Sequence, residues 1–192
     1  IKVIIGGNCV SNAISDYKYA IANKDSKIPD YISYIEEESF DCAMTGEGEF
    51  SCVQLVNALT NDLDISKIPG LVKKIGSKKY IINPPVRIHD LNLLPTPPRH
   101  LVNMEGYFKI GAFMNSYSKS KRVLSVMCSR GCPEKCGFCT TPEMWGANVR
   151  WRSTAHIMKE INNAVKDFKI GEIQFDDDTL TINKKNLYSL CN

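Results

Sequence analysis

Short apolar runs that end in glycine-rich turns set the pattern of the first part of the chain. The run Lys2–Ile5 is followed by a glycine pair, and the run Asp41–Met44 is followed by the turn Thr45–Glu49. Short apolar runs bounded by turn residues predict buried strands. Both turns would then lie at the carboxyl ends of strands, and in an open parallel sheet this edge is where ligands bind.

The segments that follow the two turns differ in pattern. After the first turn, a polar sequence with several Tyr and Lys residues predicts irregular structure to about Pro29. After the second turn, apolar residues at helical spacing predict a helix over residues 50–60. These apolar positions are Phe50, Val53, Val56 and Leu59. Further on, residues 71–75 and 80–82 flank Gly76 and Ser77, which is the signal of a β-hairpin.

A proline-rich segment over residues 83–98 separates two parts of the chain. Proline fixes φ and lacks an amide hydrogen, so this segment is not expected to form regular structure. We therefore expect a strap or linker with a domain boundary in this region. The predicted organisation is a first domain over residues 1–68, a hairpin and connector over 69–121, and a second domain over 122–192.

The second half of the chain carries the pattern of a βαβ unit. Arg122–Met127 predicts a buried strand that leads into a cysteine-rich loop, and Glu172–Phe175 predicts the next strand. Between them, Ser153 predicts the N-cap of a helix that ends at Gly171. The apolar face of this helix consists of Ile157, Ile161, Ala164, Val165 and Phe168. This order of elements begins a parallel α/β domain, and since a (β/α)8 barrel needs about 250 residues, we expect the domain to be cut short.

The amino-acid composition excludes only a few classes of protein. The 192 residues are 43% hydrophobic and 23% charged, which fits a globular domain with a core. The net charge of +3 is too small to indicate nucleic-acid binding, and we expect neither a membrane span nor a signal peptide. Clustered cysteines fit a reducing, cytoplasmic setting better than a disulfide framework. Because the chain opens on Ile1, within a strand-like run, we expect a fragment truncated at both ends.

The stretch CSRGCPEKCGFC holds four of the chain's eight cysteines. Structural zinc usually takes two Cys-x2-Cys pairs, or one pair with two histidines, but only Cys136 and Cys139 form such a pair here. An iron–sulfur cluster is favoured, because thiolates are its usual ligands and the spacing Cys132-x3-Cys136-x2-Cys139 offers three of them. In a four-iron cluster one iron would lack a protein ligand, and open metal positions serve chemistry. For Cys128 we expect a small buried side chain at the strand end.

On these residues the sequence resembles the radical S-adenosylmethionine (SAM) superfamily. Its hallmark is Cys-x3-Cys-x2-Cys on the loop after the first barrel strand, and an aromatic residue before the third cysteine, here Phe138, is also typical. The resemblance implies a [4Fe-4S] cluster whose open iron binds the amino and carboxylate groups of SAM. It further implies that electron transfer cleaves SAM to a 5′-deoxyadenosyl radical, which abstracts hydrogen from the substrate.

Motifs outside the cysteine loop resemble the branch of this superfamily that carries a cobalamin-binding domain in front of the barrel. They are SRGCP at 129–133, WG at 145–146, VRWRS at 149–153 and FDDDTLT at 175–181. Ahead of them, Gly6 and Gly7 resemble the glycine pair of the cobalamin domain, and Gly46, Glu47 and Gly48 resemble its later turn. Glycines at such turns would let the backbone approach a large flat cofactor closely. The resemblance therefore implies cobalamin contacts at these residues.

The resemblance also places SAM at the ends of the first barrel strands. Asp177 and Asp178 would accept hydrogen bonds from the SAM ammonium group, and Arg152 would meet its carboxylate. With Phe138, these residues form the expected SAM site. The alternative is that the aspartates form a solvated turn before a helix capped by Thr181, and that Arg152 is an exposed strand residue.

Together these features predict an α/β fold: the C-terminal half of a Rossmann-like cobalamin-binding domain, followed by the first βαβ unit of a (β/α)-barrel radical SAM domain. The predicted function is a cobalamin-dependent radical SAM enzyme that transfers a methyl group to an unactivated centre. Its partners would be a small-molecule substrate and a flavodoxin- or ferredoxin-type electron donor. Two alternatives stay open. One is a methylthiotransferase acting on tRNA, with Cys9, Cys42 and Cys52 holding a second cluster, and the other is a zinc-binding interaction module.

Overall fold

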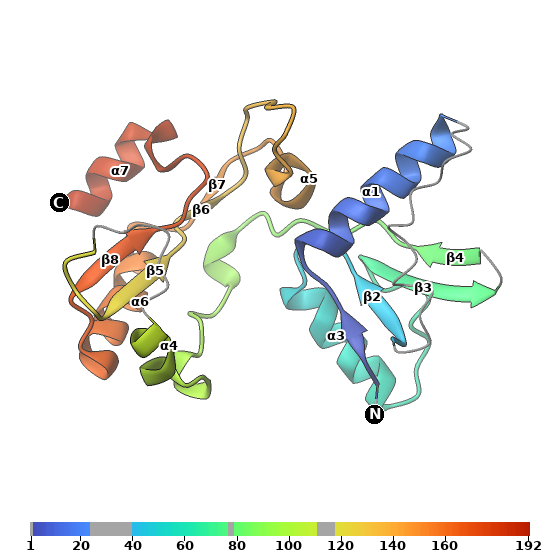
Figure 1. The fold of residues 1–192 in the computed structure, drawn as a ribbon, viewed down its shortest axis with the longest axis horizontal. Helices are drawn as coiled ribbons and strands as arrows, with labels where there is room; N and C mark the ends of the chain where they lie inside the picture. Colours follow the sequence, from blue (N-terminus) through green and yellow to red (C-terminus); the bar gives the residue numbers. More distant parts are fainter. Residues whose placement is uncertain (1, 24–39, 77–78, 111–117) are drawn as a thin grey trace. The chain divides into compact units, whose positions relative to one another are not determined.

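The computed structural model describes residues 2–23, 40–76, 79–110 and 118–192. The chain divides into two compact units (Figure 1). Unit 1 comprises Ile1–Ile88 and Pro133–Asn148, and unit 2 comprises His89–Cys132 and Val149–Asn192. The first division falls inside the proline-rich segment, whereas the predicted domain bounds 1–68, 69–121 and 122–192 stay a prediction. Among the described residues, no helix is long and apolar enough to cross a membrane.

Unit 1 is built around a four-stranded mixed sheet in the order β1-β2-β3-β4. β1 (Ile4–Ile5) and β2 (Cys42–Met44) pair in parallel, and β3 (Leu71–Gly76) and β4 (Lys79–Ile82) continue the sheet antiparallel. The predicted strands and hairpin are confirmed, except that Ser77 lies outside the described residues. The hairpin extends this sheet, because β3 pairs with β2. β1 is only half-buried at the sheet edge, so the expectation of a buried first strand is wrong.

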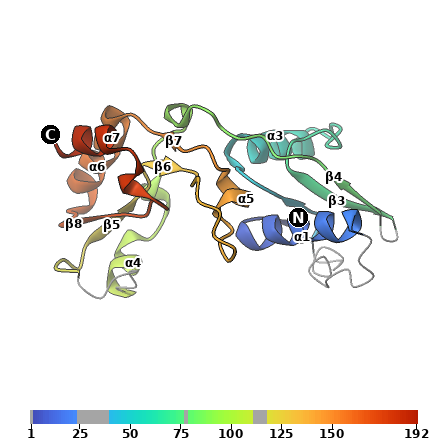
Figure 2. The same ribbon diagram turned by 90° about the horizontal axis from the view of Figure 1, so that it is seen from above.

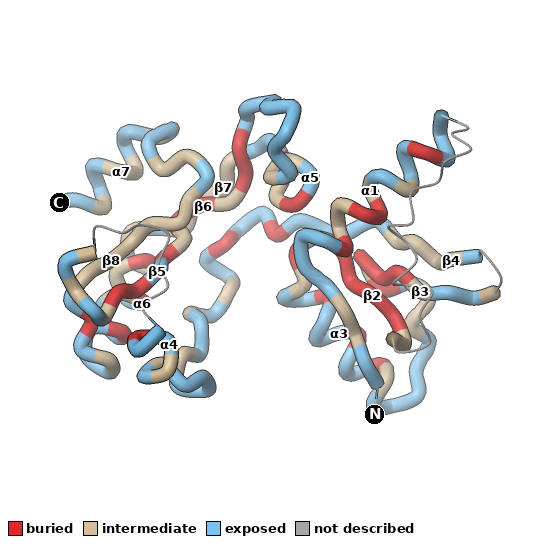
Figure 3. Tube along the Cα trace, viewed as in Figure 1, coloured by how far each residue is buried: buried red, intermediate tan, exposed pale blue. Residues whose placement is uncertain are grey.

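Two helices cover opposite faces of this sheet (Figure 2). α1 (Asn8–Ala22) packs against the face that carries Ala43 and Val72, whereas α3 (Glu49–Thr60) packs against the face that carries Leu71. The faces alternate because successive side chains of a strand point in opposite directions. β2 and the start of β3 are buried between the helices (Figure 3).

The helices of unit 1 correct two details of the sequence analysis. α1 occupies the segment that was expected to be irregular, and its buried residues follow helical spacing: Val10, Ala13, Ile14 and Ala20. Ser, Asp and Lys residues among them mask this period in the sequence. α3 confirms the second predicted helix, but the side chains that it buries are Ser51, Leu55 and Ala58. Phe50, Val53 and Val56 are exposed, so the apolar period identified the helix but not its packed face.

Unit 2 contains the predicted βαβ unit. β5 (Val123–Val126) pairs in parallel with β8 (Glu172–Phe175), and α6 (Thr154–Phe168) connects them. The core of this unit lies between the strands and the helices α6 and α4 (Met104–Ile110). Its buried members are Phe108, Leu124, Val126, Cys128, Ile157, Ala164 and Ile170. Of the predicted helical face, Val165 is exposed.

The ends of the helices in unit 2 follow ordinary capping chemistry. Ser153 caps α6 as predicted, because its Oγ accepts a hydrogen bond from His156 N at 3.2 Å. At the other end the cap is Lys169, which is left-handed at φ 53°, and not Gly171. The last helix, α7 (Lys184–Cys191), is capped by Asn183 and not by Thr181.

The remaining elements are short. They are the 3-10 turns η2 (Leu91–Leu93), η3 (Arg99–Leu101) and η4 (Leu180–Ile182), the strands β6 (Ser129–Arg130) and β7 (Arg150–Trp151), and the helix α5 (Thr141–Trp145). η2 lies within the proline-rich segment. The expectation that this segment has no regular structure is therefore wrong for these three residues, which form a 3-10 turn. The segment is nevertheless mainly an irregular strap, as proline content predicts.

Candidate functional site

The two glycine turns of unit 1 lie at the carboxyl ends of the neighbouring parallel strands β1 and β2. Gly6 and Gly7 join β1 to α1, and the segment that ends at Gly48 joins β2 to α3. A hydrogen bond links the second turn to the first turn of α1, since Gly46 N donates to Ser11 Oγ at 3.1 Å. The predicted rim is therefore present, and backbone forms most of it.

Glycine stands at the positions of this rim for different physical reasons. Gly7 has φ 97°, a conformation that other residues rarely adopt, and a Cβ there would meet nothing within 4 Å. Gly46 also has a positive φ, and its Cβ would lie 2.5 Å from the Cβ of Pro85. Gly48 would meet only the Sγ of Cys52, at 3.0 Å. Packing within the protein thus accounts for Gly46, whereas the open space beside Gly7 leaves room for a ligand.

The cysteine loop is enclosed by a two-stranded ribbon. β6 and β7 pair antiparallel, with Ser129 opposite Trp151 and Arg130 opposite Arg150. Arg152 N extends this pairing by donating to Cys128 O at 2.8 Å. The ribbon therefore fixes both ends of the loop at the end of β5.

The three cysteines of the motif are free thiols. Cys132 is buried, with its Sγ 3.5 Å from Thr179 Oγ1, and Cys136 and Cys139 are exposed. A turn joins the last two, in which Cys139 N donates to Cys136 O at 3.0 Å. Within the described ranges, no three His, Cys, Asp or Glu side chains are gathered closely enough to hold a metal ion. The donor set still fits an iron–sulfur cluster, because three unpaired thiols lie on one short loop.

Cys128 differs from the other thiols of the loop. It is fully buried, as the sequence predicts, and burial with the nearby carboxylate of Asp177 raises the pKa of its thiol to about 12. A thiol with this pKa stays protonated near neutral pH and is a poor metal ligand. We therefore do not expect Cys128 to bind a metal together with the three cysteines of the motif.

Asp177 and Arg152, two of the four expected SAM ligands, are held by neighbouring backbone and side-chain groups. Asp177 accepts hydrogen bonds from Cys128 N at 3.0 Å, from Ser129 N at 2.6 Å and from the Ser129 hydroxyl. Arg152 pairs with Glu160 and donates to a strand carbonyl. Phe138 is 91% exposed and Asp178 is exposed. SAM binding at these residues stays a prediction.

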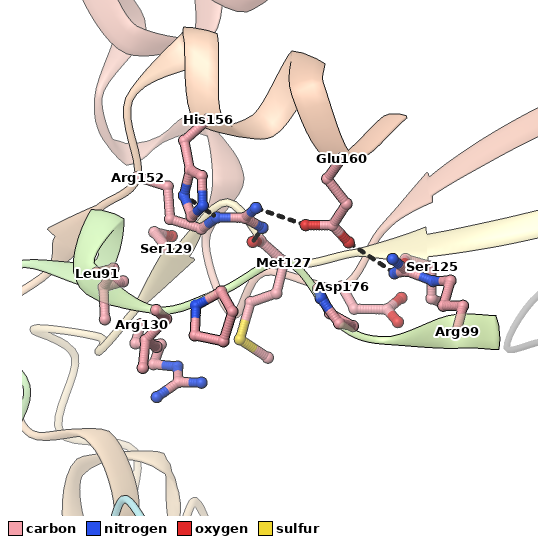
Figure 4. Close-up of a pocket in the computed structure, with 13 residues that line it drawn as sticks. Leu91, Arg99, Ser125, Met127, Ser129, Arg130, Arg152, His156, Glu160 and Asp176 are labelled. Atoms are coloured by element: carbon pink, nitrogen blue, oxygen red, sulfur yellow. Dashed lines mark hydrogen bonds and ion pairs between the residues drawn. The ribbon is translucent and has the colours of Figure 1, made fainter. Parts of the chain in front are cut away.

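A cavity of about 230 Å³ opens beside the end of β5 (Figure 4). It is lined in part by Leu91, Met127, Arg130 and Asp176. Asp176 Oδ1 is buried and has no hydrogen-bond partner among the residues that the structure describes. A buried carboxylate oxygen without a donor favours a ligand that brings one.

Two residues of this region, Arg99 and Glu160, were not predicted from the sequence. Glu160 is 2% exposed on α6 and pairs with both Arg99 and Arg152. A signal was present, because Glu160 falls three residues after Ile157 and four before Ala164, within the apolar stripe of the helix. A charged residue in such a stripe indicates a buried partner.

Comparisons with known proteins give relatives with methyltransferase names. No protein-family model matches the chain. An uncharacterized methyltransferase of Pyrococcus horikoshii is 33% identical over 145 residues, which are 76% of this chain and 30% of that protein. Cytidylyl-2-hydroxyethylphosphonate methyltransferase of Streptomyces wedmorensis is 26% identical over 168 residues, with 77% and 32% covered. The chain thus spans about a third of the length of these relatives.

Solved structures share the fold. The radical S-adenosylmethionine methyltransferase TsrM of Kitasatospora setae, solved with cobalamin and a [4Fe-4S] cluster, matches with a TM-score of 0.62 at 18% identity over 94% of this chain and 32% of its own. The cobalamin-dependent S-adenosylmethionine radical enzyme OxsB matches with a TM-score of 0.63 at 18% identity over 98% of this chain and 23% of its own. These matches show that the chain shares the fold of these two enzymes, and its sequence relatives are named as methyltransferases.

Proposed function

We propose that this chain is part of a cobalamin-dependent radical SAM enzyme that transfers a methyl group to an unactivated centre of a small molecule. One observation carries the proposal: the motif Cys132-x3-Cys136-x2-Cys139 follows the first strand of a parallel βαβ unit. Relatives named as methyltransferases, and a hopanoid C-3 methylase of Methylococcus capsulatus that is 29% identical over 125 residues, support methyl transfer. These residues cover 65% of this chain and 22% of the methylase.

Cys132, Cys136 and Cys139 would hold a [4Fe-4S] cluster. When bound, the cluster would supply the electron for reductive cleavage of SAM, delivered by a flavodoxin- or ferredoxin-type donor. The exposed Cys136 and Cys139 are accessible for cluster assembly, and the buried Cys132 ties the cluster to the end of the barrel strand. Asp177 supports this end by accepting hydrogen bonds from the backbone in front of Cys132.

The acid that meets the SAM ammonium group would be Asp176, with Asp178 beside it. Asp177 already accepts three hydrogen bonds from the start of the loop, whereas Asp176 Oδ1 is a buried acceptor to which no described residue donates. An ammonium group would satisfy this oxygen with a charge-assisted hydrogen bond. This revises the sequence prediction, in which Asp177 was a SAM ligand.

Cobalamin would bind along the glycine rim of unit 1. Gly7, next to Gly6, offers an open approach to the backbone, and Gly46, Glu47 and Gly48 form the neighbouring turn. Because both turns end parallel strands, they share the edge of the sheet where α/β folds bind cofactors. TsrM and OxsB have been solved with cobalamin, which supports this assignment.

The test is spectroscopic and uses anaerobically reconstituted, reduced protein. We expect an electron paramagnetic resonance signal of a reduced iron–sulfur cluster, and we expect addition of SAM to change it. Cys136→Ala should lack the signal, and Cys128→Ala should keep it. Tightly bound zinc in place of iron, or a spectrum that SAM leaves unchanged, would contradict the proposal.

The tRNA methylthiotransferase alternative fits the structure less well. It needs Cys9, Cys42 and Cys52 as ligands of a second cluster, but Cys42 is 4% exposed and packs between β2 and α3. Burial also raises the pKa of the Cys42 thiol, which disfavours the thiolate that binds metal. We therefore retain the cobalamin-dependent enzyme as the proposed function.

A further inference from the structure

A buried carboxylate between two arginines lies beside the start of the cysteine loop. Glu160 on α6 contacts Arg99 Nη2 through Oε1 at 2.6 Å and Arg152 Nη2 through Oε2. The three side chains are 2%, 16% and 11% exposed. Figure 4 shows the two guanidinium groups on either side of the carboxylate. We call these residues the Arg–Glu–Arg triad.

Both arginines of the triad also donate to the backbone at the end of β5. Arg99 Nη2 donates to Ser125 O at 3.2 Å, and Arg152 Nη1 donates to Met127 O at 2.8 Å. These carbonyls point away from β8, because the intervening Val126 O accepts from Asp176 N on the β8 side. The triad therefore occupies the edge of β5 that β8 leaves open, and it supplies hydrogen bonds that a neighbouring strand would otherwise supply.

The same strand end is held on its other edge by Asp177. This carboxylate accepts from Cys128 N and Ser129 N, directly after the carbonyl of Met127 that Arg152 binds. The backbone from Ser125 to Ser129 is thus fixed by charged groups on both edges. Cys132 is the third residue after this segment.

Stability alone is a weak reason for such a triad. Burying charges costs several kcal/mol per ion, and well-packed apolar residues often replace a buried ion pair without loss of stability. A side chain that only filled the space would leave the carbonyls of Ser125 and Met127 without these donors. The arrangement points to a requirement for a defined backbone position.

We propose that Glu160 is a positioning residue for the cluster loop. It orients Arg99 and Arg152 so that their guanidinium groups fix the end of β5, from which the loop with Cys132 begins. This inference rests on the proposed function, because the loop is taken to hold the cluster. It also assigns Arg152 to the backbone of the loop, whereas the sequence suggested a SAM carboxylate. Arg99, which begins η3 directly after the proline-rich segment, takes part in the same task.

The decisive variant replaces the whole triad by apolar residues, as Arg99→Met, Glu160→Leu and Arg152→Met together. We expect this triple variant to fold, with a thermal midpoint near that of the parent chain. Its reconstituted cluster should nevertheless lose iron to a chelator on the order of tenfold faster, because hydrogen bonds from charged donors are lost at the strand end. Amide exchange in the peptide that contains Cys128 and Ser129 should accelerate by a similar factor.

Two further variants complete the design. Arg152→Lys keeps the charge but not the planar donor fork, and we expect the same faster exchange and iron loss. Asp167→Asn removes an exposed acid from the same helix and should behave as the parent chain does. If the triple variant does not fold, Arg152→Lys alone decides the question by the same two readouts.

The outcomes separate this inference from the proposed function. A folded triple variant with the exchange and iron retention of the parent chain would overturn the positioning role. A parent chain that binds no iron would overturn the proposed function. The exchange comparison would then still decide whether the triad fixes the strand end.

Discussion

The two rims of parallel strands in this chain differ in what they present to a ligand. The rim at β1 and β2 consists mainly of backbone, with open space beside Gly7, and its buried acid is Glu47. The rim at β5 and β8 is built from charged side chains, with Asp177 on one edge of the strand and Arg152 with Glu160 on the other. A backbone rim lets a large flat cofactor approach closely, whereas a charged rim fixes the position of a short loop.

The largest expected effect comes from breaking the charged rim at its centre. Glu160→Gln leaves two buried arginines without their carboxylate, and we expect a loss of about 3–5 kcal/mol in the free energy of unfolding of unit 2. Urea denaturation followed by circular dichroism measures this loss. The matched control is Asp167→Asn, which should change stability by less than about 0.5 kcal/mol. Equal effects of the two substitutions would show that the triad has no special role.

A smaller loss is expected when the other edge of the same strand is released. Asp177→Ala removes the acceptor of two backbone amides and one hydroxyl, which should cost about 1–3 kcal/mol. The neighbouring exposed acid allows a matched comparison, since Asp178→Ala should cost less. Denaturation curves and amide exchange at Ser129 report on this difference. The reverse order would contradict our distinction between the aspartates.

At the backbone rim, the loss of stability on replacing a glycine should depend on the φ angle of that glycine. Gly7→Ala should cost about 1–3 kcal/mol, because φ 97° with ψ −174° is unfavourable for a residue with a Cβ even in open space. Gly48→Ala should cost less, since its φ is −87° and only the Cys52 side chain must move. Gly48 is therefore the better position at which to test cobalamin binding by titration. Weaker binding at unchanged stability would support the proposed cobalamin site, whereas unchanged binding would argue against it.

The smallest effect concerns the pH dependence of unit 2. Burial, with the charges of Arg152 and Lys159, lowers the pKa of His156, although Glu160 and the backbone of Leu94 act in the opposite direction. A lowered pKa in the folded state means that the unfolded chain binds the proton more readily. The stability that His156 contributes is therefore complete above about pH 6.5 and is lost as the pH falls below this value. His156→Gln should make the unfolding midpoint depend less on pH between pH 7 and about pH 5. The same pH dependence in the variant and the parent chain would contradict this account.

Local patterns predicted β1 to β5 and β8, because short apolar runs bounded by turn residues are read directly from sequence, but they did not predict the two-residue strands β6 and β7. The βαβ unit could be predicted for the same reason, together with the Ser153 cap. The packed face of α3 could not, since Leu55 and Ala58 pack on the sheet while the more conspicuous Phe50 and Val53 do not. Apolar content alone does not say which face a sheet will cover.

The site was predictable to the extent that its chemistry is local in sequence. Cys132, Cys136 and Cys139 are identified by spacing on one loop. The roles of Asp177 and Glu160 depend on partners 48 and 61 residues away, at Ser129 and Arg99. No single-sequence pattern reports such pairs. The assignment of acids and arginines at the strand ends therefore needed the structure.

The central claim is that three cysteines of this chain, and not four, hold an iron–sulfur cluster. The most direct measurement is the iron and sulfide content per chain after anaerobic reconstitution. We expect about four of each for the parent chain and for Cys128→Ala. We expect almost none for Cys132→Ala, Cys136→Ala and Cys139→Ala. Loss of iron in Cys128→Ala equal to that in Cys136→Ala, or one zinc ion per chain in place of iron, would contradict the account.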